Sequence, residues 1–335
     1  MIIGIYKSGG FSDRWISYCE RNNISYKLVD VYANDIISQL SDCDVFMWHF
    51  SHRDYKDVQF AKSLLISLEN SGKKVFPNIS TCWHFDDKIS QKYLLEAIGA
   101  PIVPTYVFYT KKEAIAWINK ISFPKVFKLK GGAGASNVQL VKTKKVALKL
   151  INKCFGRGFS QIRFFDEIKE FYGKKGLSLD FIKVVLYMLL GKDVRDFVRY
   201  RGNEKGYVYF QEFIPNNEYD IRVCVIGNKA FALKRNNREN DFRASGSGNI
   251  IYDKSQIDER CVDISFSVNR FLKMQSVAFD FVFDEQGEPL IVEVSYGYMA
   301  KAYDSCEGYW TSDLKWHPGS NFDFCGWMVE DLLKK

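Results

Sequence analysis

Two carboxylates lie inside apolar stretches near the C-terminal end of the chain. Asp280 and Glu293 fall within VAFDFVFDEQGEPLIVEVS, a pattern that predicts two adjacent strands joined by a glycine-containing turn. A carboxylate flanked by Phe, Val and Ile is costly to bury unless a cation satisfies it. Oxygen ligands on neighbouring strands suit Mg²⁺, which keeps substrate phosphates in its remaining positions. The pair therefore predicts a magnesium site, unless both side chains face solvent on an edge hairpin.

A second stretch, VFKLKGGAGASNVQLV at 126–141, points to phosphate. A glycine-rich loop exposes backbone N–H groups that can cradle phosphate oxygens, and Lys128 would add a positive charge nearby. The GxGxxG and GxxxxGK[ST] fingerprints do not apply, because both need a helix after the loop and NVQLVK alternates like a strand. Taken alone, the stretch favours an ordinary hairpin with a flexible tip, so the other motifs have to decide.

Four motifs, in their order along the chain, resemble the ATP-grasp superfamily of carboxylate–amine ligases. DDKISQKYLLEAIGAPIVPTY resembles the family's Asp-Lys helix and the proline motif after it, and FPKVFKLKGGAGASNVQLV resembles its lysine strand and glycine-rich lid. QEFIPNNEYDIRVCVIGNKAFALKR is similar to its hinge and adenine strand, and VAFDFVFDEQGEPLIVEVS to its metal strands. The resemblance covers roughly residues 1–300, and four motifs in order are far more specific than any one of them.

The resemblance implies the cofactors ATP and Mg²⁺ and a role for each of several residues. The ATP phosphates would be bound by Lys88, Lys128, Gly131, Gly132, Gly134 and Ser136. The adenine pocket would be lined by Gln211, Glu212 and Ile214, and the ribose would be held by Glu218. The catalytic arginines near the transferred phosphoryl group would be Arg222, Arg235 and Arg243. The Mg²⁺ ligands would be Asp280, Glu293 and Ser295.

Two departures from the family pattern affect the expected chemistry. The family usually has Glu-x-Asn at the metal strand, whereas this chain has Glu293-Val294-Ser295, so a hydroxyl replaces an amide oxygen. Serine can still bind Mg²⁺ directly or through water. The loop DFRASGSG resembles one in ribosomal-protein glutamate ligases, but Ser245 stands where that group has asparagine. We therefore expect a different substrate.

A finer resemblance concerns the tail AYDSCEGYWTSDLKWHPG and MWHFSHRD near the start. Both look like a subgroup of ATP-grasp proteins associated with bacterial surface-polysaccharide synthesis. His49 and His52 follow the third predicted strand, at the edge where open α/β sheets bind ligands, although surface loop histidines explain them equally well. The tryptophans that could stack on sugar rings, or simply pack in the core, are Trp310, Trp316 and Trp327.

The order of predicted elements indicates an α/β protein, α+β in its C-terminal part, and the resemblance implies the ATP-grasp fold after an N-terminal parallel α/β domain. Strand and helix patterns alternate over the first hundred residues, which predicts a parallel sheet. We expect three parts: an N-terminal domain at 1–104, a lid subdomain at 105–210 and a metal-binding subdomain at 211–335. Within the lid, residues 155–205 read as a basic helical insertion, which either recognises an acidic glycan or only shields the nucleotide.

Composition excludes several other classes of protein. The chain of 335 residues is 47% hydrophobic and 26% charged, which is typical of folded globular proteins. A net charge of +7 without a dense basic stripe argues against nucleic acid as a partner. Eight cysteines without a CxxC pair, and no apolar run near the roughly 20 residues of a membrane span, favour the reducing cytoplasm.

The activity expected from this resemblance is an ATP-dependent carboxylate–amine ligase that forms an amide through an acyl phosphate. Its partners would be a small-molecule or glycan carboxylate and an amine, with a homodimer and peripheral contact with membrane-bound glycan machinery as further expectations. Two alternatives stay open: a nucleotide-binding regulatory protein without turnover, which Ser295 favours, and an interaction protein that works through residues 155–205.

Overall fold

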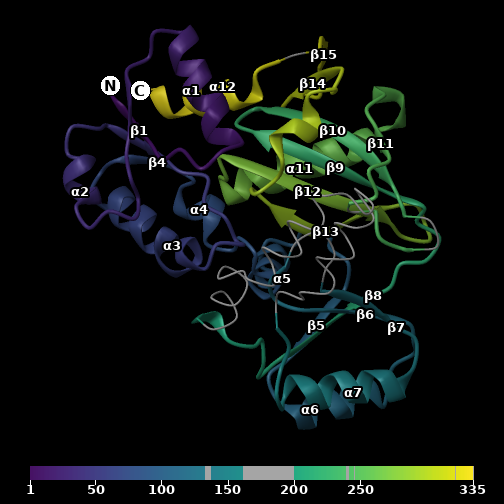
Figure 1. Cartoon of the computed structure of the whole chain (residues 1–335). Coiled ribbons are helices and arrows are strands. Elements are labelled where there is room, and N and C mark those ends of the chain that lie inside the picture. The colour runs from purple at the N-terminus through teal and green to yellow at the C-terminus, as the bar shows by residue number, and fades with distance from the viewer. Residues whose placement is uncertain (133–136, 161–199, 239–240, 245, 321, 335) are drawn as a thin grey trace, which may run out of the picture.

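The described residues form three β-sheets, which Figure 1 shows in three parts of the molecule. This computed structural model describes residues 1–132, 137–160, 200–238, 241–244, 246–320 and 322–334. Both termini lie together beside the N-terminal sheet (Figure 1). The core of the expected insertion, 161–199, lies outside the described residues, as do Gly134, Ser136 and Ser245.

The first sheet is parallel, as the alternating strand and helix patterns predicted. Its four strands run in the order β2-β1-β3-β4. The strands are β1 (Ile3–Ile5), β2 (Tyr26–Leu28), β3 (Val45–Met47) and β4 (Lys74–Phe76). The helices between and after them are α1 (Phe11–Arg21), α2 (Ile36–Gln39), α3 (Tyr55–Asn70) and α4 (Ile79–Cys82). All three residues of β1 and of β3 are buried, as parallel strands covered on both faces should be.

The second sheet is antiparallel and has the order β5-β8-β6-β7. Its strands are β5 (Thr105–Phe108), β6 (Lys125–Lys128), β7 (Val138–Val141) and β8 (Val208–Glu212), and its helices are α6 (Lys111–Ile118) and α7 (Lys144–Cys154). Apolar residues of α6 and α7 pack on Phe127 and Phe210 of this sheet. The predicted hairpin around the glycine-rich segment is confirmed, because β6 and β7 pair antiparallel with Lys128 opposite Val138.

The third sheet is also antiparallel and has the order β13-β12-β9-β10-β14-β15, with β11 paired to β10. Its strands are β9 (Tyr219–Ile226), β10 (Lys229–Asn236), β11 (Ile250–Ile251), β12 (Ser276–Phe283), β13 (Pro289–Ser295), β14 (Gly308–Thr311) and β15 (Trp316–Pro318). The remaining helices described are α5 (Lys88–Ala97), α11 (Glu259–Leu272) and α12 (Phe324–Leu333), with 3₁₀ turns η1 (Lys254–Gln256) and η2 (Ala300–Tyr303). The alternating stretches DIRVCVIG and KAFALKR around Gly227-Asn228 predicted the hairpin of β9 with β10, and the strand pair around Asp280 and Glu293 predicted that of β12 with β13. The sequence predicted neither β14, β15 nor α12.

Alternation along the central strands separates two environments. Phe279 and Phe281 of β12 point to the face covered by α11, where Val262 and Phe266 pack on them. Asp280, between these two phenylalanines, points to the opposite face. Burying a large apolar side chain contributes roughly 1.5–3 kcal/mol, so the α11 face fixes which side of the sheet carries the polar residues.

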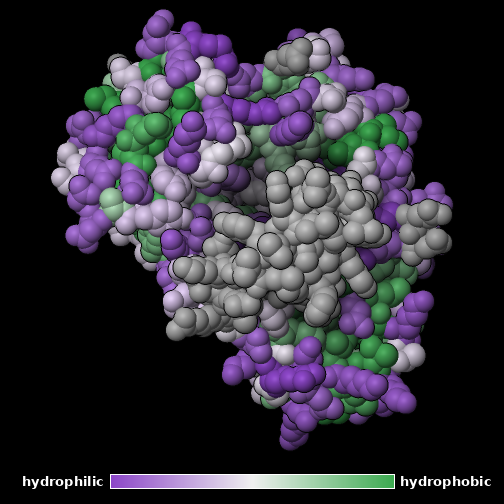
Figure 2. Space-filling view, in the orientation of Figure 1, coloured by the Kyte–Doolittle hydropathy of each residue, from purple (hydrophilic) through white to green (hydrophobic). Residues whose placement is uncertain are grey.

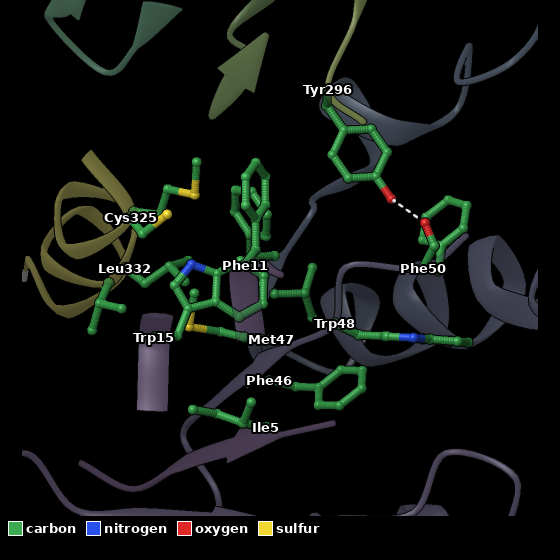
Figure 3. Close-up of a cluster of buried hydrophobic side chains, with 14 of the residues drawn as sticks. Ile5, Phe11, Trp15, Phe46, Met47, Trp48, Phe50, Tyr296, Cys325 and Leu332 are labelled. Atoms are coloured by element: carbon green, nitrogen blue, oxygen red, sulfur yellow. Dashed lines mark hydrogen bonds between the residues drawn. The ribbon is translucent and has the colours of Figure 1, made fainter. Parts of the chain in front are cut away.

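The interface between the first and third sheets is filled by large aromatic side chains. Trp15 of α1, Trp48 after β3 and Tyr296 after β13 are all completely buried there. Figure 3 shows the Tyr296 hydroxyl pointing to the Phe50 carbonyl, with Cys325 and Leu332 of α12 closing one side of the same cluster. The C-terminal helix therefore belongs to the same core as α1.

Two further features bear on the sequence-based expectations. All eight cysteines are buried free thiols. Within the part of the chain that the structure describes, no helix is both long and apolar enough to cross a lipid bilayer. On the face that Figure 2 shows, hydrophilic residues predominate outside the grey region, and hydrophobic residues form small separate groups.

The predicted boundaries at 104/105 and 210/211 remain predictions. Strand β8 (Val208–Glu212) runs across the second of them. Phe159 and Glu204 exchange two backbone hydrogen bonds of 2.9 and 2.8 Å, so the two residues that flank the segment between them lie side by side. An inserted segment must have its two ends close together in this way.

Gln275 joins the first and third sheets, and its removal should weaken the fold measurably. Its Oε1 accepts the Asn78 N–H at 2.8 Å, and its Nε2 donates to the Val75 carbonyl at 2.9 Å. Gln275→Ala leaves both backbone groups without this partner, so we expect the free energy of unfolding in urea to fall by about 2 kcal/mol. The exposed Gln286→Ala should change it by less than about 0.5 kcal/mol, and equal values for the two variants would contradict this assignment.

Candidate active site

A row of charged side chains crosses the third sheet on the face opposite α11. Strand register places Asp280 of β12 directly between Glu293 of β13 and Arg222 of β9. The pairing of β12 with β13 shifts register immediately after Asp280, which marks a bulge at this point. The two carboxylates that the sequence analysis paired are therefore direct neighbours on adjacent strands.

Asp280 is held by two arginines. Arg222 donates two hydrogen bonds to it, the one from Nη2 measuring 2.6 Å, and the Arg235 Nη2 lies 3.1 Å from its Oδ2. Burial by itself would raise the pKa of Asp280, but the charges and hydrogen bonds of both arginines outweigh it and hold that pKa far below its ordinary value. Asp280 is therefore a carboxylate at every pH at which the protein would be studied.

The sequence analysis missed one member of this network, Asp220. Its carboxylate receives two hydrogen bonds of 2.6 Å from Arg235. Burial raises the pKa of Asp220 in spite of the attraction of Arg235. The signal was available in the sequence, because Asp220 and Arg222 are two residues apart on one strand and so share a face.

Ser295 lies at the end of β13, two residues beyond Glu293 and on the same face. Its hydroxyl oxygen accepts the Gly297 N–H at 3.1 Å. A hydroxyl oxygen has a second lone pair, so this bond leaves it able to accept a cation as well. Asp280, Glu293 and Ser295 together supply the oxygen donors that suit a hard divalent cation.

Lys88 connects this row to the glycine-rich segment. It is the first residue of α5, and its buried Nζ lies 3.2 Å from Glu293 Oε1 and donates to the Gly132 carbonyl at 2.9 Å. Burial would lower the pKa of Lys88, but the carboxylates of Glu293 and Asp86 raise it above its ordinary value. Lys88 is therefore a fixed cation between two of the sheets.

Lys128 is a buried cation without a direct partner. It is the last residue of β6 and only 5% exposed, and its Nζ makes no hydrogen bond or ion pair with any residue that the structure describes. Burial lowers its pKa to about 8, an effect that Lys88 reinforces and Glu293 opposes. A buried ammonium that lacks a counter-ion is what an anionic ligand would satisfy.

The glycine-rich segment approaches this pair of lysines. Gly132 has φ +113°, and a Cβ there would lie 2.5 Å from Asn137 Nδ2, so neither the backbone nor the space admits a larger residue. Gly131 precedes it and is buried. The predicted phosphate-binding residues that the structure describes, Lys88, Lys128, Gly131 and Gly132, therefore belong to one region.

The residues predicted to bind adenine and ribose follow one another along β8 and the loop after it. Gln211 is buried and donates to Thr105 Oγ1 at 3.1 Å, while Glu212 pairs with Lys125 at 2.7 Å. Beyond the strand, Ile214 is half-buried and Glu218 is exposed. A small cavity of about 20 Å³ is lined by residues predicted to bind phosphate (Lys88), adenine (Gln211) and Mg²⁺ (Glu293).

A larger cavity, of about 380 Å³, lies elsewhere, between α1 and the segment that follows η2. Arg14 and Asp304 form a bidentate ion pair on its wall, with oxygen–nitrogen distances of 2.7 and 2.8 Å. None of the predicted site residues lines it. We therefore place the candidate active site at the charged row and the two lysines.

Arg243 differs from the other two predicted arginines. It pairs with Asp241 at 2.6 Å, in the segment between β10 and β11, whereas Arg222 and Arg235 lie on strands and meet at Asp280. The strand positions of the first two follow from the sheet register. The position of Arg243 depends on a loop.

His49 and His52 follow β3, at the C-terminal edge of the parallel sheet. The His49 ring lies 4.4 Å from the Phe11 ring and 5.5 Å from the Tyr296 ring, and the His52 ring lies 5.5 Å from that of Phe85. Neither Nε2 has a hydrogen-bond partner among the described residues. Burial and then His52 lower the pKa of His49 to about 4, so its imidazole is neutral.

The comparisons with known proteins agree with this geometry. A family model described as a RimK-like ATP-grasp domain matches residues 160–305. The chain is 21% identical over 284 residues to the alpha-aminoadipate–LysW ligase LysX of Saccharolobus solfataricus, covering 82% of this chain and 85% of the relative.

Two solved structures have the same fold. The RimK domain ATP-grasp protein of Sphaerobacter thermophilus matches over 100% of both chains with a TM-score of 0.56 and 14% identity. The biotin carboxylase domain of the Hydrogenobacter thermophilus 2-oxoglutarate carboxylase, solved with MgADP, matches 100% of this chain and 70% of its own, with a TM-score of 0.62 and 11% identity.

These matches agree with the three-sheet fold. They also agree with ATP and Mg²⁺ as the cofactors that the site residues are suited to bind. ATP-grasp enzymes use ATP and Mg²⁺, and here the buried Lys128, unpaired among the described residues, lies in the field of the carboxylates Glu293 and Asp280. The comparisons point to an ADP-forming carboxylate–amine ligase. The chain therefore has the ATP-grasp fold, and the comparisons support the ATP-grasp ligase superfamily, with the match to a RimK-like ATP-grasp domain over residues 160–305.

Proposed function

We propose that this enzyme activates a substrate carboxylate with ATP and joins it to an amine. A carboxylate oxygen attacks the γ-phosphorus of ATP, ADP leaves, and an acyl phosphate forms. The amine nitrogen then attacks the acyl carbon, phosphate leaves, the nitrogen loses a proton, and an amide remains. The observation that carries this proposal is Lys128, a buried cation with no described partner, in the field of Glu293 and Asp280.

The chain's own residues position and neutralise the phosphates. Lys88 and Lys128 bind the triphosphate, and the backbone at Gly131, Gly132 and, outside the described residues, Gly134 and Ser136 supports it. Arg222 and Arg235 are held rigidly by Asp280 and Asp220, so they stabilise negative charge without reorganising during the reaction. Arg243 would approach the phosphoryl group from its loop.

Mg²⁺, bound by Asp280, Glu293 and Ser295, would neutralise charge on the phosphate oxygens. In the free protein Lys88 pairs with Glu293, and two arginines pair with Asp280. Because these cations compensate both carboxylates, neither carboxylate carries an unpaired charge in the free protein. Gln211, Glu212 and Ile214 would line the adenine pocket, and Glu218 would hold the ribose.

For the substrate, we propose an acidic surface polysaccharide or its precursor as the source of the carboxylate, and an amino compound as the amine. The similarity of the aromatic tail to polysaccharide-associated ATP-grasp proteins and the net charge of +7 support this class. Trp310 cannot stack on a sugar, because it is 1% exposed and its indole donates to Glu259 at 3.2 Å. Trp316 and Trp327 are half-buried and remain candidates.

An amino acid as the second substrate is supported by the relative from Saccharolobus solfataricus, whose name describes ligation of alpha-aminoadipate to LysW. A homodimer and peripheral contact with membrane-bound glycan machinery complete the proposal for partners. The decisive experiment is a screen of uronic acids and amino acids, in pairs, for release of ADP and phosphate in the presence of Mg²⁺ and ATP.

One specific observation favours a second candidate, a regulatory protein that binds nucleotide without turnover. Ser295 replaces the usual amide ligand, and its hydroxyl already accepts the Gly297 N–H. Such a protein would bind MgATP and release no ADP with any pair in the screen, whereas a ligase would release ADP only when both substrates are present.

The metal site predicts the outcome of removing one carboxylate. Glu293→Ala deletes a ligand of Mg²⁺ and the partner of Lys88, so ADP release should fall by about a thousandfold or more, while the melting temperature changes little, since Glu293 is one-third exposed. Glu285→Ala, an exposed glutamate in the preceding turn, is the matched control and should keep full activity. Full activity in folded Glu293→Ala would falsify the metal assignment.

Restoring the more usual family ligand tests the departure at 295. Ser295→Asn should retain activity, because an amide oxygen is also a ligand of Mg²⁺. ADP release by this variant, measured beside the wild type at several Mg²⁺ concentrations, provides the comparison. A folded but inactive Ser295→Asn protein would show that the hydroxyl itself is required.

Lys128 gives a prediction that separates charge from packing. Lys128→Met keeps an apolar stem but loses the ammonium, so the Kd for a non-hydrolysable ATP analogue with Mg²⁺ should rise by about 10- to 100-fold. The exposed Lys142→Met is the control and should bind like the wild type. Isothermal titration measures the two Kd values. An unchanged Kd in Lys128→Met would show that the Lys128 ammonium does not bind the nucleotide, and would contradict the proposal.

The depressed pKa of Lys128 also predicts a pH dependence. The ammonium is the form that binds phosphate, and in the free protein it loses its proton near pH 8. Binding above that pH must take up a proton, so the Kd of the wild type should rise about tenfold between pH 7 and pH 9. In Lys128→Met the Kd should change far less over the same range. Parallel profiles for the two proteins would contradict this role.

A further inference from the structure

Asp86, two residues before Lys88, has an unusual backbone conformation and a specific partner. Its φ is +54°, in the left-handed region that non-glycine residues rarely adopt, although aspartate and asparagine tolerate it best. Its Oδ1 accepts the Gly132 N–H at 2.7 Å. A residue in a rare conformation whose side chain reaches a neighbouring element points to a positional role.

Asp86 and Lys88 hold both backbone groups of the same glycine. Asp86 accepts the Gly132 N–H, and the Lys88 Nζ donates to the Gly132 carbonyl at 2.9 Å. Two residues before Gly132, the Lys130 carbonyl accepts the Lys88 N–H at 2.9 Å. Lys88 also pairs with Glu293, so Gly132 is fixed relative to the metal-binding strand as well. A charge-assisted bond such as that of Asp86 is stronger than one between neutral groups.

Gly132 has a backbone conformation that favours glycine and lies close to Asn137. Its φ is +113°, and a Cβ there would lie 2.5 Å from Asn137 Nδ2. The direction of the peptide at Gly132 therefore depends on the two side chains that hold its N–H and its carbonyl. Lys88 is already assigned to the phosphates, whereas Asp86 had no role.

We propose that Asp86 is a positioning residue for nucleotide binding, which acts by holding the Gly132 N–H and so fixes the Gly132 peptide beside Lys88 and Glu293. This inference rests on the proposed phosphate-binding role of Lys88. It does not depend on which carboxylate or amine the enzyme uses, so it can be tested with nucleotide alone.

Three variants of Asp86 separate its acceptor oxygen, its charge and its backbone conformation. Asp86→Gly keeps the positive φ and removes the acceptor, so the Kd for the Mg²⁺ complex of a non-hydrolysable ATP analogue should rise about tenfold. Asp86→Asn keeps an acceptor oxygen and tolerates the same φ, so its Kd should stay within about threefold of the wild type. Asp86→Ala loses the acceptor and also strains the backbone, so it should bind at least as weakly as Asp86→Gly.

A control is needed because any of these changes can also lower stability. Asp258 caps α11 through the Arg260 N–H at 2.9 Å, on the opposite side of the third sheet from the charged row. Asp258→Ala should lower the melting temperature through loss of its cap without changing the Kd. A Kd that follows melting temperature across all four variants would mean that Asp86 only stabilises the fold.

Isothermal titration at one pH and one Mg²⁺ concentration gives the outcomes. Weak binding by Asp86→Gly with rescue by Asp86→Asn supports the proposal. Wild-type affinity in Asp86→Gly overturns it, and so does an equal loss in Asp86→Asn, because the acceptor oxygen would then not be what matters. If the wild type binds no nucleotide, both this inference and the proposed function fail. If nucleotide binds and no substrate pair is found, only the ligase proposal is affected.

Discussion

The structure depends on how Asp280 is compensated in a buried position. Its carboxylate lies between a core of phenylalanines and the site, where an unpaired charge would cost several kcal/mol even after relaxation. Arg222 and Arg235 remove most of this cost through short, directed hydrogen bonds. Asp220 in turn holds Arg235. The four side chains form a rigid network whose geometry is set by the strand register of β9, β10 and β12 rather than by flexible loops.

Against this compensated network, the lysines have two different electrostatic states. Lys88 is paired with Glu293 and keeps its proton, whereas Lys128 has no direct partner among the described residues and its pKa falls to about 8. The site therefore holds one satisfied and one unsatisfied cation within a small region. An anionic ligand gains most at the unsatisfied one, because that charge has already lost its water and gains a counter-ion on binding.

The N-terminal sheet and the metal strands are joined by packing as well as by charge. Tyr296 directly follows Ser295, and its buried ring contacts Phe50, Phe76 and Phe85 of the N-terminal part. Trp15 and α12 extend the same cluster, which Figure 3 shows. A shift of the N-terminal sheet would therefore move the end of β13 and its oxygen donors. This coupling explains why His49 and His52 lie close to a site built mainly on another sheet.

The sequence by itself determined the local features of this protein. Alternation placed Asp280 opposite its phenylalanine neighbours and predicted the hairpins of β6 with β7, β9 with β10 and β12 with β13, because side-chain direction in a strand follows from a period of two. The order of the motifs predicted the fold class. The motifs also identified the carboxylates Asp280 and Glu293 and the lysines Lys88 and Lys128 as site residues.

Only the tertiary structure decided which partners these residues have. That Asp220 completes the arginine network, that Lys88 is paired and Lys128 is not, and that Asp86 reaches Gly132 are contacts between segments far apart in the chain. The hairpin of β14 with β15 and helix α12 went unpredicted for the same reason, since the edge of β10 and the face of α1 stabilise them. A sequence pattern records which way a side chain points, but hydrogen bonding and desolvation depend on what the fold brings opposite to it.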